Sequence, residues 1–212
     1  MPPQCVWVMT FDPIALEERL ARLPPQHRTA FAAACAQRQL ENYEVFHRDA
    51  GWGEPQVLVD ALALLWEAVA HPGTADQARL RVLAQRAEAQ APDLQQHGSV
   101  WAGFALDAAA AVAYALWSFL DEDAQQAAWA AGGAYESIYH YVSWELDPSP
   151  DPTSDEQVHA HPWMREELQR QEEDLRMLEV TEALGPNHLA LLRERSESGG
   201  LRPVQRALRY LG

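Results

Sequence analysis

Asp107 is the residue of this chain whose type and position are best suited to chemistry. It is the one charge in the apolar run 101–120. A carboxylate in such surroundings must be paired, hydrogen-bonded or protonated. We expect a structural pairing, with Arg38 or Tyr43 as the partner and Asn42 beside them. The alternative is a pocket around Asp107, in which the carboxylate is a general acid or binds a ligand.

Two Glu-x-x-His pairs have the spacing of metal ligands. They are Glu44 with His47 and Glu156 with His159. On a helix this spacing puts both side chains on one face, as in the carboxylate-bridged di-iron sites of helical bundles. The chain is rich in Glu and has eight His, so such pairs also arise by chance. We therefore predict no metal site.

A polar and aromatic stretch lies between two expected helices. Asn42 and Tyr43 open it, and Gly51 and Gly53 bracket Trp52. Glycines permit a positive φ in a tight connection, and Trp52 is large enough to fill a gap there. Because Trp and Tyr are also favoured at binding hot spots, this region stays open as a contact site.

The net charge of −15 is concentrated in one part of the chain. Residues 144–182 carry twelve acids and three Arg. Such a surface repels nucleic acid and anionic membranes and attracts a basic protein, although an acidic face also serves solubility alone. The side chains that we expect to meet a partner are Glu166, Glu167, Glu172, Glu173, Asp174 and Trp52.

Sequence motifs of common enzymes are absent. The chain has no Gly-x-Gly-x-x-Gly, P-loop, His-Glu-x-x-His, Gly-x-Ser-x-Gly or Cys-x-x-Cys. Cys5 and Cys35 are far apart, and we expect unpaired thiols in a reducing cytoplasm. We predict no catalytic residue and no cofactor. The N-terminus lacks the basic and apolar regions of a signal peptide, so we expect a cytoplasmic protein.

The residues above must be positioned by helices. The stretch 99–120 is apolar all round and rich in Ala, which predicts a buried central helix rather than a membrane span. Before it we expect four helices: from Asp12 to Leu23, from there to Leu40, from Pro55 to 70, and from a Thr74 cap to 90. After it we expect a helix from 124 to Leu146, with an interruption or bend at Gly132-Gly133, and a helix from Pro162 to Leu184. Two short helices are expected near 187–196 and 202–211.

The fold class follows from these elements. Apart from a short candidate strand, 6–9, no alternating pattern predicts β-structure. We predict an all-α bundle of seven to nine helices forming one domain, 1–212. The helix from Thr74 is expected to be peripheral. A Pro-rich linker is predicted at 147–154, with Ser154 capping the helix that follows it.

Several of these residues also form a family pattern. Its members in the first third of the chain are Arg19-Leu20, Arg22-Leu23, Phe31, Arg38, Asn42-Tyr43-x-x-Phe46, Gly51-Trp52-Gly53, Gln56 and Trp66-Glu67. Further along, the pattern continues through Ala105-Leu106-Asp107-Ala108, Ser154-Asp155-Glu156 and Pro162. The chain thereby resembles the YjaG-like family of bacterial proteins, a domain-of-unknown-function family. It departs from that family in Trp52, where Phe is usual, in Pro55, and in an extended N-terminus.

The resemblance implies an all-helical protein with no established enzymatic activity and a link to histidine-kinase signalling. It offers no catalytic residues to transfer. Our leading hypothesis is a non-catalytic, acidic interaction module, such as an immunity or inhibitor protein that binds a basic toxin domain. A cytoplasmic adaptor in kinase signalling and an enzyme or ligand binder around Asp107 are the alternatives. The sequence does not indicate the oligomeric state.

Overall fold

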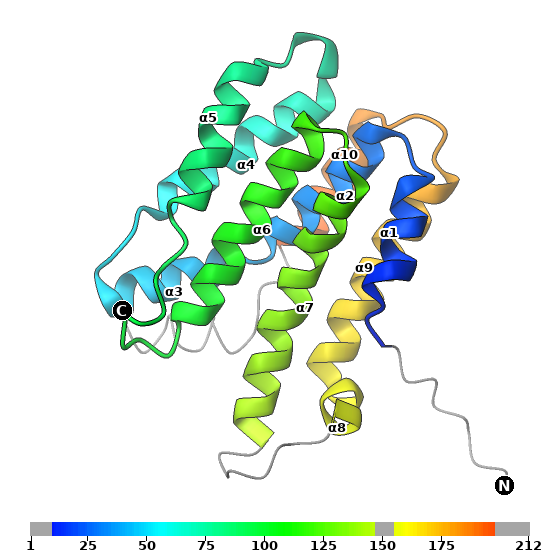
Figure 1. Ribbon diagram of the computed structural model, residues 1–212. Coiled ribbons are helices and arrows are strands. Elements are labelled where there is room, and N and C mark those ends of the chain that lie inside the picture. Colours follow the sequence, from blue (N-terminus) through cyan, green and yellow to red (C-terminus); the bar gives the residue numbers. More distant parts are fainter. Residues whose placement is uncertain (1–9, 147–154, 198–212) are drawn as a thin grey trace, which may run out of the picture.

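The computed structural model describes residues 10–146 and 155–197, and helices account for most of them. Within these ranges no strand occurs. The α-helices are α1 Pro13–Ala21, α2 Pro25–Gln37, α3 Leu40–Ala50, α4 Pro55–Ala70, α5 Gln77–Glu88, α6 Ala102–Leu120, α7 Ala124–Leu146, α8 Asp155–Ala160, α9 Pro162–Val180 and α10 Pro186–Glu197, with the 3-10 turn η1 at Pro72–Thr74 (Figure 1). The predicted all-α bundle is confirmed: in the described part of the chain nine α-helices are nine residues or longer, and α8 adds six residues.

The apolar helix α6 lies at the centre of the bundle. Helices α2, α3, α4, α5 and α7 all pack on it (Figure 1). Most of its alanines are buried, and Ala105, Ala108 and Ala109 are fully so. Because Ala side chains are small, several neighbouring helices approach the α6 backbone closely. Among the described residues, α6 is also the one helix long and apolar enough to cross a membrane, a criterion that a core helix meets equally.

Helix α7 is continuous through Gly132 and Gly133, so of the predicted interruption or bend the interruption is wrong. A Cβ at Gly133 would lie 3.3 Å from the backbone oxygen of Asp107 and 3.6 Å from the Cβ of Ala111. The glycine therefore serves the close approach of α7 to α6 and does not break the helix.

The expected loop after Leu40 is instead helix α3. The chain turns at Arg38 and Gln39, where the Asn42 side chain donates to the Gln39 side-chain oxygen at 2.7 Å. Both side chains are buried, so this bond holds a sharp corner between α2 and α3. Helix α3 ends at Gly51, whose φ of +63° matches the positive value predicted from its type.

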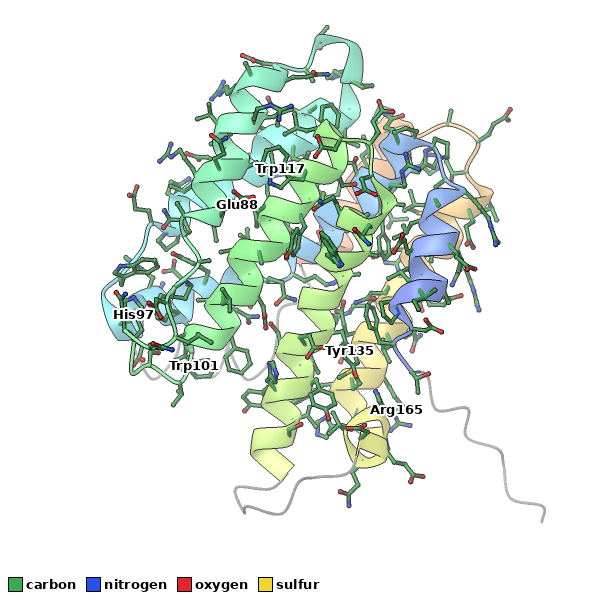
Figure 2. The ribbon with its side chains drawn as sticks, viewed as in Figure 1. Glu88, His97, Trp101, Trp117, Tyr135 and Arg165 are labelled. Atoms are coloured by element: carbon green, nitrogen blue, oxygen red, sulfur yellow. The ribbon has the colours of Figure 1, made fainter. Side chains whose placement is uncertain are left out.

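Helix α5 differs from its prediction at its start and in its position. The side chain of Asp76, not of Thr74, caps the helix by accepting from the Arg79 backbone N–H. Leu80 is fully buried against the core, so α5 is not peripheral. Figure 2 shows Trp117 of α6 beside Glu88 of α5, where the indole N–H donates to the carboxylate at 2.6 Å.

The remaining helix starts agree with the sequence patterns, whereas α2 ends at Gln37 and α9 at Val180, before the predicted Leu40 and Leu184. The side chain of Asp12 caps α1 by accepting hydrogen bonds from the backbone N–H groups of Ile14 and Ala15. Pro162 begins α9, and Pro186 begins α10. The strand expected at 6–9, the linker at 147–154 with its Ser154 cap, the helix expected at 202–211, and Cys5 lie outside the described residues.

Candidate functional site

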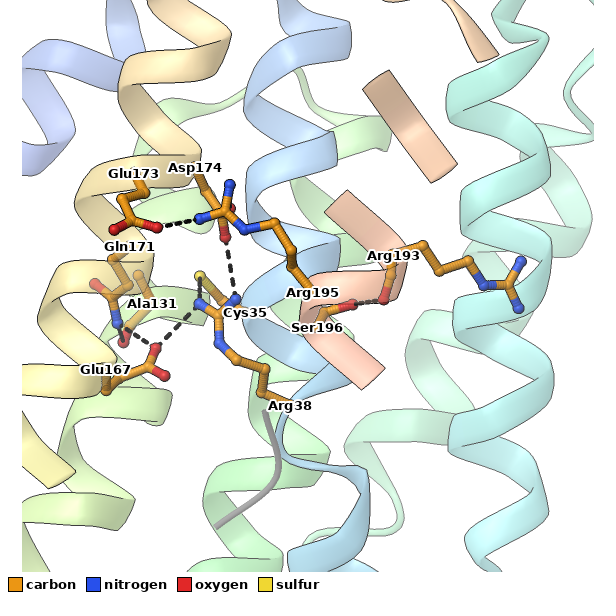
Figure 3. Close-up of polar contacts among 10 residues, drawn as sticks. All are labelled: Cys35, Arg38, Ala131, Glu167, Gln171, Glu173, Asp174, Arg193, Arg195 and Ser196. Atoms are coloured by element: carbon orange, nitrogen blue, oxygen red, sulfur yellow. Dashed lines mark hydrogen bonds and ion pairs between the residues drawn. The ribbon is translucent and has the colours of Figure 1, made fainter. Parts of the chain in front are cut away.

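Arg38 does not pair with Asp107. It follows the last residue of α2, its side chain is 2% exposed, and it forms ion pairs with two acids of α9 (Figure 3). One guanidinium nitrogen donates to Glu167 at 3.0 Å, and the other donates to Asp174 at 3.2 Å. The predicted pairing of Asp107 with Arg38 is therefore wrong, and Arg38 instead attaches α9 to the core.

Further polar groups complete this buried cluster. Gln171 donates to the Glu167 carboxylate and to the backbone oxygen of Ala131 in α7, and Arg195 of α10 lies 3.3 Å from Asp174. Two cations thus face two anions. Cys35 accepts from Arg38 at 3.2 Å, and burial raises the pKa of its thiol to about 12. A thiol with that pKa is not a nucleophile at neutral pH.

The cluster changes the interpretation of the acidic helix α9. Glu167 and Asp174, predicted to meet a partner, are 3% and 1% exposed, because they neutralise Arg38 inside the protein. The prediction is wrong for both residues. The acids that do reach the surface are bound by Arg side chains: Glu166 by Arg170, Glu172 by Arg19 and Arg176, and Glu173 by Arg195.

Tyr43 and Trp52 close a loop and do not face Asp107. The Tyr43 hydroxyl donates to the backbone oxygen of Gln90 at 3.0 Å. Trp52 packs on Phe46 and on His97, with ring centroids 5.9 and 4.8 Å apart. These contacts join the α3–α4 connection to the segment before α6. The predicted pairing of Tyr43 with Asp107 is wrong, and Trp52 is half-buried.

In each Glu-x-x-His pair the His side chain contacts a residue other than its Glu. Glu44 pairs with Arg48, while Nδ1 of His47 lies 3.1 Å from the Trp52 backbone oxygen. His159 hydrogen-bonds the Tyr135 hydroxyl at 2.9 Å. In the described ranges no group of three or more His, Cys, Asp or Glu side chains is arranged to hold a metal ion.

Asp107 lies near the surface between α6 and α7. The Ser137 hydroxyl donates to its Oδ2 at 3.0 Å, and no other described residue hydrogen-bonds this carboxylate. Burial raises the pKa of Asp107 to about 6, against the opposing effects of the Ser137 bond and of His140. The carboxylate therefore changes charge just below neutral pH, and Oδ1 remains available to an external donor.

The residues around Asp107 form an apolar surface. Six half-exposed positions of α6 recur every three or four residues, which places them on one side of the helix. We call them the α6 stripe: Gly103, Leu106, Asp107, Ala110, Tyr114 and Trp117. Beside the stripe, Trp129 of α7 is 43% exposed, and its ring lies 5.3 Å from that of Tyr114.

A recess of about 350 Å³ opens at the N-terminal end of the α6 stripe. It is lined by Val100, Gly103, Phe104 and His140. The Phe104 ring is held between Trp101 and Tyr141, at centroid distances of 5.6 and 6.3 Å, so this wall is fixed. Asp107 follows Gly103 by one helical turn and interacts electrostatically with His140, which lines the recess. We call the α6 stripe, Trp129, Glu136 and this recess the α6–α7 face.

Sequence reasoning located Asp107 and missed the rest of this face. An all-round apolar pattern was interpreted as burial on every side, so no residue of α6 was expected at the surface. A signal was present, however: the one charge, a glycine, and the polar-tipped Tyr114 and Trp117 all share the spacing of a single helix side.

The sequence matches the family described as "Protein of unknown function (DUF416)" over residues 15–202. The chain belongs to the DUF416 family. The crystal structure of a DUF416 family protein from Shewanella baltica OS155 is similar to it, with 25% sequence identity and a TM-score of 0.76 over 87% of this chain and 94% of that chain. None of the curated proteins matches it. The similarity to that crystal structure supports the fold described above.

Proposed function

We propose that this DUF416 protein is a non-catalytic interaction module, and that the α6–α7 face binds a basic, amphipathic helix of a partner protein. The observation that supports this most is the α6 stripe itself. It is a surface of apolar and aromatic side chains along the central helix, with Asp107 as its charge. Apolar surfaces rimmed by polar groups are typical of protein-binding sites.

The residue types on this face are those that favour binding. Trp117, Trp129 and Tyr114 are aromatic side chains of the kind enriched at binding hot spots. Arg81 of α5 lies 5.4 Å from the centre of the Trp117 ring, and Glu88 accepts a hydrogen bond from the indole N–H of Trp117. These contacts hold the Trp117 ring in place before a partner binds, which lowers the entropy lost on binding.

The charges around the face select the partner. Near the stripe four exposed carboxylates accompany Arg81, so the rim is acidic on balance: Glu88, Asp121, Glu122 and Glu136. The whole chain also has a net charge of −15. Such a rim attracts cations and repels anions. An amphipathic helix with apolar residues toward the stripe and Lys or Arg at its edges matches both properties.

A photo-crosslinking amino acid placed in the native host tests the surface. At position 110 or 129 it should form an adduct with one basic protein, whereas at Glu173 of α9 it should not. Adducts at Glu173 alone would restore α9 as the contact surface. An adduct with a second copy of this chain at 110, together with a dimer mass in solution, would make the face a self-association site.

The finer features of the function also belong to this proposal. A cytoplasmic immunity or inhibitor protein bound to a basic toxin domain is its concrete form, and an adaptor in histidine-kinase signalling is the alternative suggested by the YjaG-like resemblance. We propose that the chain belongs to a YjaG-like group within DUF416, because it contains the Asn42-Tyr43 and Gly51-Trp52-Gly53 motifs. The identity of the crosslinked protein distinguishes these forms.

A further inference from the structure

The recess near Asp107 combines apolar walls with nearby negative charge. Val100 and Phe104 supply apolar surface, and at Gly103 the helix backbone is open, since a Cβ there would meet no atom within 4 Å. Its volume of about 350 Å³ falls at the small end of ligand sites, which measure roughly 300–1,000 Å³. A short aliphatic chain is the complement of these walls.

Two carboxylates lie close to His140, which lines the recess. Asp107 keeps Oδ1 free, while its Oδ2 is fixed by Ser137 at 3.0 Å. Glu136 is exposed on α7, where its Oε2 lies 3.9 Å from Nε2 of His140. Two carboxylates beside an apolar recess favour a cation, and Phe104, which lines the recess, offers an aromatic ring to the same ligand.

We propose that this recess binds one Arg or Lys side chain of the partner, with the stem against Val100, Gly103 and Phe104 and the charged end on Asp107. The inference rests on the proposed function and names the residue type that the α6–α7 face selects. The face thus has two parts: the aromatic end around Trp117 contributes apolar contact, and the recess contributes the requirement for a cation.

A small probe tests the recess without any partner. We would titrate isotope-labelled protein with n-butylguanidinium and follow backbone and His140 signals by NMR. Saturable shifts confined to the recess are expected. The neutral n-pentanol and the anionic pentanoate are the matched probes. Binding at least about tenfold weaker for both is expected, because they lack the charge-assisted hydrogen bond to Asp107.

Three variants sharpen the titration. Asp107→Asn keeps the shape and removes the charge, so n-butylguanidinium should bind at least about tenfold more weakly. Gly103→Leu fills the recess and should abolish binding, while its melting temperature confirms the fold. Asp60→Asn removes an exposed carboxylate of α4 and should change nothing.

The outcomes separate the two proposals. Equal binding of pentanol, or binding that survives both Asp107→Asn and Gly103→Leu, overturns the assignment of the recess. If the partner still crosslinks at position 110 in that case, the proposed function stands. If the recess binds its probe as expected but no protein adduct forms at 110 or 129, the proposed function fails, and the recess is a site for small cations.

Discussion

Two helices of this protein reverse what their compositions suggest. Helix α9 is strongly acidic, yet it contributes Glu167 and Asp174 to the interior, where Arg38 neutralises them. Helix α6 is almost entirely apolar, yet one side of it reaches the surface as the α6 stripe. The comparison shows that composition gives the average environment of a helix, whereas the neighbouring helices decide which side is covered.

The difference has an energetic reason. A carboxylate is buried at acceptable cost only when a cation and further hydrogen bonds meet it, and α2 supplies that cation at its last turn. No such requirement holds for an apolar stripe, which stays exposed when no helix covers it. An uncovered apolar stripe of this kind is available for contact with another molecule, as the proposed function requires.

The largest expected effect comes from breaking the buried cluster. Arg38→Ala leaves Glu167 without a cation and Asp174 with Arg195 alone, and it should lower the free energy of unfolding by about 3–5 kcal/mol in urea denaturation. Arg176→Ala is the control: that side chain is 72% exposed, and the loss should stay below about 0.5 kcal/mol.

A triple variant separates charge from packing in this cluster. Arg38→Met combined with Glu167→Gln and Asp174→Asn removes the buried charges together and should recover most of the loss. Equal stability of Arg38→Ala and the native protein would show that α9 is not held by its ion pairs.

Replacing the glycine at the α6–α7 contact should have the next largest effect on stability. Gly133→Leu forces a side chain against the Asp107 backbone oxygen, so it should cost about 1–3 kcal/mol of unfolding free energy. Gly103→Leu places the same side chain on the open side of α6 and should leave stability unchanged or raise it. A thermal or urea unfolding series compares the two directly; similar losses would mean that Gly103 is not exposed.

The pH dependence of stability tests the surroundings of Asp107. Its pKa is about 6 in the folded protein and 3.8 for the ordinary group, so the native state holds its proton more tightly than the unfolded state. The native protein should therefore lose stability relative to Asp107→Asn as the pH rises through this interval. Because Asp107 is only partly buried, we expect about 1–2 kcal/mol. If the difference in unfolding free energy between the two proteins stays constant from pH 4 to 7, the Asp107 carboxylate is fully exposed to water.

The smallest stability effect belongs to the exposed aromatics of the face. Trp129→Ala should change the free energy of unfolding by less than about 1 kcal/mol, because the ring is 43% exposed. The same variant should weaken partner binding at least about fivefold. Titration calorimetry with the crosslinked partner measures the binding, and a loss of folding instead of binding would assign Trp129 to the core.

The sequence was sufficient for the architecture and for part of the site. The Ala-rich run predicted the central helix, and Pro and Asp residues predicted most helix starts, because these signals are local. The pairing of Arg38 with α9 was not predictable, since the partners are more than 125 residues apart in the chain. The α3 helix was missed because buried polar side chains, such as Asn42, resembled a loop.

The central claim is that the partner lies on the α6–α7 face, and one matched pair of variants tests it most directly. Ala110→Arg puts a cation in the middle of the α6 stripe, and Ala63→Arg makes the same change on the exposed side of α4. The affinity for the protein crosslinked at position 110 or 129 should fall at least about tenfold for Ala110→Arg, through charge repulsion and lost contact. It should stay unchanged for Ala63→Arg. Equal affinities of the two variants would contradict the assignment of this face.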